Sequence, residues 1–125
     1  MKMFEILELQ NLYNSISDTK LPLKTTYKFA RLMKRAEEEI GFYKTNFQKI
    51  IEEFGQKDEA GDYKMSEDGM SIVIIPGRES ECNERVFELR NLEVPIDDIK
   101  FFIDELEKLD VSITELSCLM SLIED

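Results

Sequence analysis

The chain has 125 residues, of which 42% are hydrophobic, a net charge of -11, and neither histidine nor tryptophan. The acidic balance argues against non-specific binding to nucleic acid or to an anionic membrane, because both need surplus Lys and Arg. Without histidine, the commonest acid/base residue at neutral pH and the usual nitrogen ligand of transition metals are missing. The length and apolar content predict a single domain over residues 1–125 that needs no metal or disulfide.

The N-terminal segment MKMFEILELQ is charged and periodic and lacks the apolar core of a signal peptide. No apolar run reaches the roughly eighteen residues of a membrane span. Cys82 and Cys118 each replace a small apolar residue within amphipathic patterns, which favours two buried free thiols over a bridge. We therefore expect a cytoplasmic protein in a reducing compartment.

Two helices joined by a turn are expected over residues 3–54. Ile6, Leu9, Tyr13 and Ile16 follow the three and four spacing of a helix over residues 4–16. The segment from Ser15 to Pro22 then breaks this helix and forms a turn. Proline is acceptable in the first turn of the next helix, because its missing N–H would be unpaired there anyway.

Residues 24–54 are predicted to form one long helix, about 46 Å in length at about 1.5 Å per residue. Its apolar residues alternate at spacings of four and three, as in a helix that buries one narrow seam. We call this row the seam; its members are Phe29, Met33, Ala36, Ile40, Tyr43, Phe47, Ile50 and Phe54. Gly55 stands where a left-handed C-terminal cap is common.

A β-hairpin is expected over residues 62–76. Strand-forming residues flank a Glu-Asp-Gly turn at 67–69, and the run from Ile72 to Ile75 suggests burial on both faces. Pro76-Gly77 ends the second strand. The fold class is therefore mainly α with a small β-hairpin inserted after a long central helix, around which the shorter helices pack.

Three C-terminal helices are predicted over residues 79–125. The first covers 79–92 and turns Cys82, Val86, Leu89 and also Phe87 inward. The second begins at Asp97-Asp98, whose charges suit a helix N-terminus. Its apolar stripe is Ile99, Phe102, Ile103, Leu106 and Leu109.

The third C-terminal helix begins at the capping-box spacing Ser112 to Glu115. Its apolar residues are Ile113, Leu116, Met120 and Ile123, and the chain ends in Glu124-Asp125.

A row of cations lies on the first half of the long helix: Lys24, Lys28, Arg31 and Arg35, which we call the basic stripe. At about 100° per residue these residues fall within about 60° of one another, on the side away from the seam. No acid occurs between Asp18 and Glu37. The stripe can bind an anion or an acidic partner, since arginine pairs with carboxylates and phosphates. Alternatively it neutralises acidic segments of the same chain or oligomer.

Other clusters predict no chemistry. Asp58, Glu59 and Asp62 lack the length and order of a calcium loop, which leaves a structural turn. The carboxylates at 37–39 and 97–98 lie at helix starts or on polar faces, where solvation explains them. Neither cysteine has the neighbours of a nucleophile, although Arg85 is near Cys82. No glycine-rich phosphate loop occurs. We therefore expect no catalysis, no metal and no cofactor.

The seam has two interpretations. Its aromatic residues and unbroken heptad spacing can join two subunits, which predicts a homo-oligomer. Packing against the other helices of the same chain is the alternative.

Three segments together resemble a family of unknown function made of small proteins from phages and prophages of Gram-positive bacteria. They are the L-P-x-K start at 21–24, the turn F-G-Q-K-D-E-A-G at 54–61, and the Leu92-Glu93-Val94 segment before a Leu/Ile-rich end. Phe54 and Ala60 stand where that family often has Tyr and Asn. The resemblance implies a phage origin and action in a bacterial cytoplasm, and it implies no activity.

The sequence thus favours a non-enzymatic phage protein that oligomerises and binds a host or phage protein, in a regulatory or anti-defence role. An alternative is sequestration of an anionic nucleotide-like molecule by the basic stripe. Virion assembly is a third possibility, and mimicry of nucleic acid by acidic surface a fourth. Membrane binding and direct nucleic-acid binding are not expected.

Overall fold

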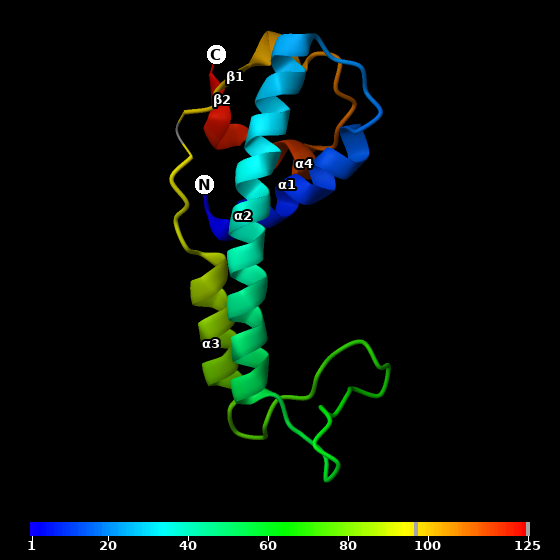
Figure 1. The fold of residues 1–125 in the computed structure, drawn as a ribbon, viewed down its shortest axis with the longest axis vertical. Coiled ribbons are helices and arrows are strands. Elements are labelled where there is room, and N and C mark those ends of the chain that lie inside the picture. Colours follow the sequence, from blue (N-terminus) through cyan, green and yellow to red (C-terminus); the bar gives the residue numbers. More distant parts are fainter. Residues whose placement is uncertain (97, 125) are drawn as a thin grey trace. The chain divides into compact units, whose positions relative to one another are not determined.

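The computed structural model describes residues 1–96 and 98–124 and is mainly helical, as the sequence predicts (Figure 1). Four α-helices are present among these residues: α1 (Met3–Ile16), α2 (Leu23–Phe54), α3 (Glu79–Arg90) and α4 (Ile113–Ser117). Two short 3-10 helices, η1 (Ile103–Leu106) and η2 (Met120–Leu122), and two strands, β1 (Phe101–Phe102) and β2 (Ile123–Glu124), complete the elements. The strands pair in parallel, with Phe101 opposite Ile123.

Contacts divide the chain into two compact units. Unit 1 comprises Met1–Gly41 and Leu92–Asp125, and unit 2 comprises Phe42–Asn91. The long helix α2 contributes residues to both units, and its bounds confirm the expected long helix. The single domain remains a prediction, because it concerns how the two units are coupled.

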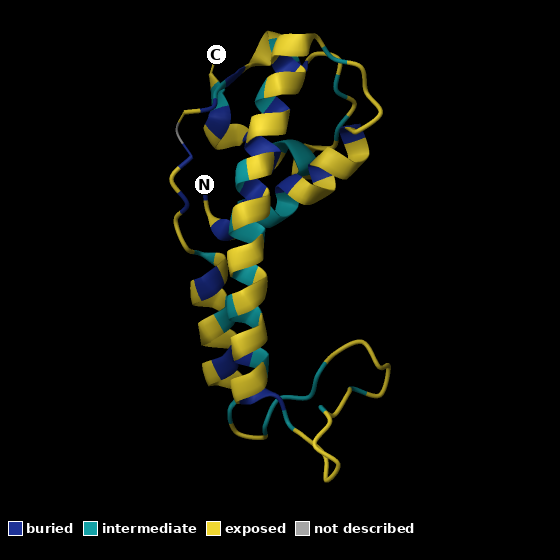
Figure 2. Ribbon diagram, in the orientation of Figure 1, coloured by how far each residue is buried: buried dark blue, intermediate teal, exposed yellow. Residues whose placement is uncertain are grey.

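The core of unit 1 combines α1, the first half of α2 and the C-terminal segment. Helix α1 buries Met3, Ile6, Leu9, Leu12 and Ile16, as the spacing predicts except that Leu12 replaces Tyr13 (Figure 2). From α2, the seam residues Phe29, Met33 and Ala36 are buried together with Leu32. The ring of Phe29 lies 4.6 Å from that of Phe101. These apolar contacts hold the C-terminal segment to α2 within the unit.

The prediction of an α-helix that begins at Asp97-Asp98 is wrong for the described residues from 98 onward. Asp97 itself lies outside the described residues. Ile99 and Lys100 belong to no helix, and β1 and then η1 follow. Ile99 and Phe101 are buried, whereas Lys100 between them is half-buried and Phe102 is exposed. This alternation has the period of a strand, and β-branched and aromatic residues favour that extended backbone.

The last predicted helix begins as expected and ends early. Ser112 caps α4 by accepting a hydrogen bond from the backbone N–H of Glu115, and the Glu115 side chain completes the capping box. The helix stops at Ser117, which leaves Met120 outside it, and both Met120 and Ile113, the first residue of α4, are exposed instead of buried on one stripe. Pairing of β2 with β1 requires extended backbone at Ile123, which a continued helix would prevent. Asp125, which ends this expected region, lies outside the described residues.

Unit 2 contains the second half of α2, the irregular segment 55–78 and α3. Its core consists of Ile50 and Phe54 from α2 and Cys82 and Leu89 from α3, which confirms that α3 packs on the long helix. Tyr43, Phe47, Ile74 and Val86 pack against this core and are half-buried. Phe87, which the sequence places inward, is 67% exposed because it lies on the opposite side of α3.

The segment 55–78 contains isolated antiparallel bridges, and no strand is assigned in 62–76. The bridges join Gly55 to Ile74, Lys57 to Tyr63 and Met65 to Ile72. The Val73 N–H donates to Lys64, while the Val73 carbonyl accepts from the Gln56 N–H. Two backbone hydrogen bonds join each pair of the three short stretches 54–58, 62–66 and 71–75, instead of a regular two-stranded ladder. The regular hairpin remains a prediction.

Gly55 differs from the expected left-handed cap. Positive φ angles occur at Gly61, Gly69 and Gly77 among the described residues, and Gly55 is not among them. A Cβ at Gly55 would lie 2.7 Å from the Ile51 carbonyl oxygen and 2.8 Å from the Tyr63 ring. The close approach of backbone and ring therefore explains this glycine, rather than its φ angle.

Candidate functional site

The basic stripe faces carboxylates of the C-terminal segment within unit 1. Lys28 Nζ lies 2.6 Å from Glu105 Oε1, and only 18% and 15% of the two side chains are exposed. The ammonium also lies 5.1 Å from the centre of the Phe102 ring. Burial raises the pKa of Glu105, but the hydrogen bond and charge of Lys28, the Phe102 backbone and the charge of Lys24 lower it, and together they outweigh burial.

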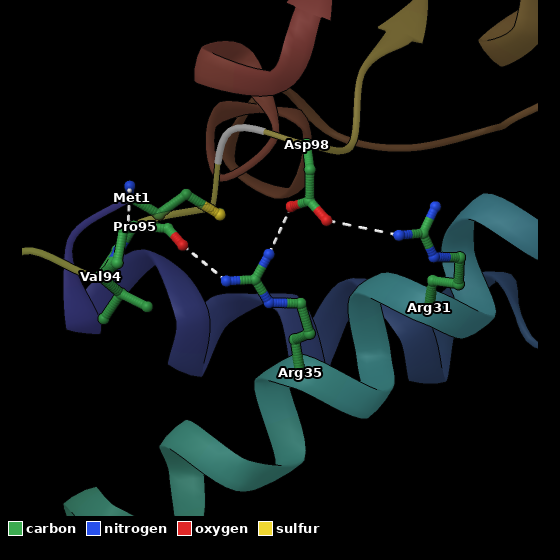
Figure 3. Close-up of polar contacts among 6 residues, drawn as sticks. All are labelled: Met1, Arg31, Arg35, Val94, Pro95 and Asp98. Atoms are coloured by element: carbon green, nitrogen blue, oxygen red, sulfur yellow. Dashed lines mark hydrogen bonds and ion pairs between the residues drawn. The ribbon is translucent and has the colours of Figure 1, made fainter.

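Arg31 and Arg35, which we call the arginine pair, converge on Asp98 (Figure 3). Arg31 Nη2 lies 3.3 Å from Asp98 Oδ2, and Arg35 Nη1 donates to Asp98 Oδ1. The second terminal nitrogen of Arg35 donates to the Pro95 carbonyl oxygen at 2.6 Å. One carboxylate therefore receives two guanidinium groups, one on each oxygen.

These pairs bear on the two interpretations of the stripe. Three of its four members contact acids of the same chain, and the fourth, Lys24, is exposed and acts on the carboxylate of Glu105 only through its charge. The pairing supports neutralisation within the chain. Asp98 and Glu105 were missed as partners by sequence reasoning. The only signal was their separation of seven residues, which equals that between Lys28 and Arg35, in reverse order.

An apolar groove lies in unit 2, between the second half of α2, α3 and the segment 63–74. We call it the unit 2 groove, and its volume is about 610 Å³. None of its lining residues carries a formal charge. They are Phe47, Gln48, Ile51, Tyr63, Met70, Ser71, Ile72, Ile74, Cys82, Asn83 and Val86. The seam indicated Phe47, but the remaining residues come together only through tertiary packing.

The other candidates have structural roles. The Asp58 carboxylate accepts hydrogen bonds from the backbone N–H groups of Ala60 and Asp62, which closes the acidic turn. Among the described residues no group of three or more acidic, cysteine or histidine side chains is placed to hold a metal ion.

Both cysteines are free and buried, as expected. Burial raises the pKa of Cys82, although the charge of Arg85 opposes the effect. Burial also raises the pKa of Cys118 to about 12. Each thiol is therefore held in its protonated, weakly nucleophilic form at neutral pH.

The seam divides between the two units. Ile50 and Phe54 are buried in unit 2, whereas Ile40, Tyr43 and Phe47 are half-buried. This burial comes from packing within the chain, and self-association through the seam remains a prediction.

No protein-family model, curated protein or solved structure matches the chain. The resemblance to the phage family therefore remains a prediction. Among the described residues, every helix is too short or too polar to cross a membrane.

Proposed function

We propose that the protein is a non-enzymatic binding module that holds an apolar segment of a partner protein in the unit 2 groove. The observation that supports this proposal is the uncharged lining of the groove in a chain of which 34% is charged. Depletion of charge, with methionine and aromatic residues in its place, is typical of the centre of a protein interface. The volume of about 610 Å³ lies within the range of ligand sites, about 300–1,000 Å³.

Met70 illustrates how the groove can accept such a segment. The residue is 81% exposed and lines the groove, which leaves a large apolar surface in water. Methionine is flexible and polarisable, so it adapts to the shape of an incoming side chain. Contact with a partner would remove this surface from water.

The lining also selects the chemistry of the partner. A charged side chain entering the groove would lose water and find no opposite charge, which is unfavourable. Gln48, Ser71 and Asn83 supply a few polar groups that can bind the backbone of a guest peptide. The inserted face is therefore apolar, presented by a short peptide segment.

The resemblance to phage proteins favours a host or phage protein as the source of this segment, in a regulatory or anti-defence role. Because the groove is assigned to the partner, oligomerisation would use another surface, such as the seam. A second copy of the chain in the groove is the competing occupant.

Selection from a displayed random-peptide library on the immobilised chain tests the proposal. We expect binders whose apolar residues recur on one face. Met70→Asp should weaken a selected peptide by about tenfold or more, because it buries a charge in the interface. Met120→Asp, at a 61% exposed methionine of unit 1, is the matched control and should leave the affinity unchanged.

Equal affinity of the two variants would contradict the groove as the binding surface. Light scattering of the chain alone separates the occupants. A dimer abolished by Met70→Asp but not by Met120→Asp would assign the groove to a second copy and overturn the partner segment.

A further inference from the structure

The arginine pair has the arrangement of a two-pronged anion site. Both guanidinium groups project from α2, one turn apart, and reach different oxygens of the same Asp98 carboxylate (Figure 3). The Pro95 carbonyl accepts from Arg35 and fixes the plane of its guanidinium. Arginine forks of this kind bind carboxylate and phosphate alike.

The basic stripe carries more positive charge than its carboxylate partners among the described residues neutralise. Among the described residues, two carboxylates pair with three of the four cations: Glu105 with Lys28, and Asp98 with both arginines. Glu105 is enclosed with Lys28, so Asp98 is the one carboxylate that pairs with both arginines among residues 1–96 and 98–124. A dianion would therefore complement the arginine pair better than one carboxylate does.

The site is open to solvent. Exposed fractions are 47% for the Arg31 side chain, 37% for Arg35 and 48% for Asp98. Asp98 and its flanking residues 94–96 and 99–100 belong to no helix or strand. A ligand in solution can thus reach the guanidinium groups. Exchange of partners needs only rotation of the exposed Asp98 side chain, which leaves the buried core residues Val94, Ile96 and Ile99 in place.

We propose that the arginine pair is a binding site for a phosphomonoester dianion, with Asp98 as an internal competitor that occupies it in the free protein. This proposal is independent of the unit 2 groove. A phosphomonoester carries a charge of about -1.5 to -2 and three terminal oxygens, enough to engage both guanidinium groups at once. Tyr27 is 62% exposed and lies 5.9 Å beneath the Arg31 guanidinium, so it offers a ring against which an aryl or other flat substituent can pack.

Calorimetric titration with inorganic phosphate and with phenyl phosphate tests the site, with sulfate at the same ionic strength as a competing anion. Asp98→Asn removes the competitor while keeping its shape, and should tighten phosphate binding by about tenfold, the effect of one hydrogen bond to a charged group. Asp104→Asn makes the same change of net charge at an exposed aspartate of η1 and should leave the affinity as in the unmodified chain. Arg31→Ala in the Asp98→Asn background should abolish the gain.

Equal gains in Asp98→Asn and Asp104→Asn would overturn the proposal, because net charge alone would then explain them. So would a gain that survives Arg31→Ala. Tighter binding of phenyl phosphate than of inorganic phosphate would assign the site to aryl phosphates through Tyr27, and equal binding would assign it to the phosphate group alone.

A second measurement uses the unmodified chain if Asp98→Asn fails to fold, as judged by near-ultraviolet circular dichroism. Phosphate should raise the thermal midpoint of unfolding more than chloride does at equal ionic strength, and Arg31→Ala should remove the difference. Identical midpoints in the two salts would overturn the site.

Discussion

Lys28 on α2 and Glu105 in η1 form an ion pair of 2.6 Å that is largely removed from solvent. The other ion pairs between described residues have side chains at least 36% exposed. Thr25, which is buried, donates a long hydrogen bond to the second oxygen of Glu105. This pair therefore joins the start of α2 to the C-terminal segment within unit 1.

Glu105→Gln is expected to lower the free energy of unfolding by about 2 kcal/mol, because Lys28 is left without its charged partner in an enclosed place. Urea denaturation measures the change. Asp104→Asn, its exposed neighbour, should stay within about 0.5 kcal/mol of the unmodified chain. Equal stability of Glu105→Gln and Asp104→Asn would show that the pair contributes nothing.

The contribution of Glu105 should depend on pH. Its pKa in the folded chain is lowered from 4.5, so the ionised form is favoured by folding. The stabilisation is complete above pH 4.5 and is lost as the pH falls through the lowered folded pKa. The difference in unfolding free energy between the unmodified chain and Glu105→Gln should be constant at neutral pH and shrink on acidification below 4.5. A difference that grows on acidification would contradict the direction of the shift.

Two glycines on α2 and just after it should respond oppositely to alanine. Gly55→Ala places a Cβ against the Ile51 carbonyl and the Tyr63 ring and should destabilise the chain by about 1–3 kcal/mol. Gly41→Ala has open space around the new methyl group and lies inside α2, so it should stabilise by about 0.5–1 kcal/mol. Thermal unfolding of both variants decides this. Similar changes in the stability of the two variants would mean that the close contacts of Gly55 do not exclude a side chain there.

The two thiols should be protected in the native chain. Cys82 and Cys118 are buried and their pKa values are raised, that of Cys118 to about 12. A thiol reagent such as a disulfide dye should react slowly with both at neutral pH, and with both at once after denaturation in urea. Rapid labelling of Cys82 alone in the native chain would mean that the unit 2 groove, which Cys82 lines, opens far enough to admit the reagent.

The helices could be predicted where a local pattern decides the structure. Spacing identified α1, α2 and α3, and the Ser112 capping box identified the start of α4. The segment from Ile99 to Leu109 was mistaken for a helix because its apolar residues fit two periods. Parallel pairing of β1 with β2, distant in sequence, decides between those periods and leaves no local trace.

The sites depend on tertiary packing to a greater degree. The basic stripe was visible because its members share one helix face, but its partners Asp98 and Glu105 lie more than sixty residues away. The unit 2 groove combines α2, α3 and an irregular segment whose bridges are isolated. Phe47 belonged to the seam, and Ile72, Ile74, Cys82 and Val86 belonged to the patterns of their own segments, but no pattern indicated that these segments meet.

We propose that the unit 2 groove holds an apolar segment of a partner protein. Chemical-shift mapping of a library-selected peptide on the isotopically labelled chain tests it most directly. We predict shifts at Phe47, Ile51, Ile72 and Asn83, absent in Met70→Asp. Shifts confined to the basic stripe, or retained unchanged in Met70→Asp, would contradict the account.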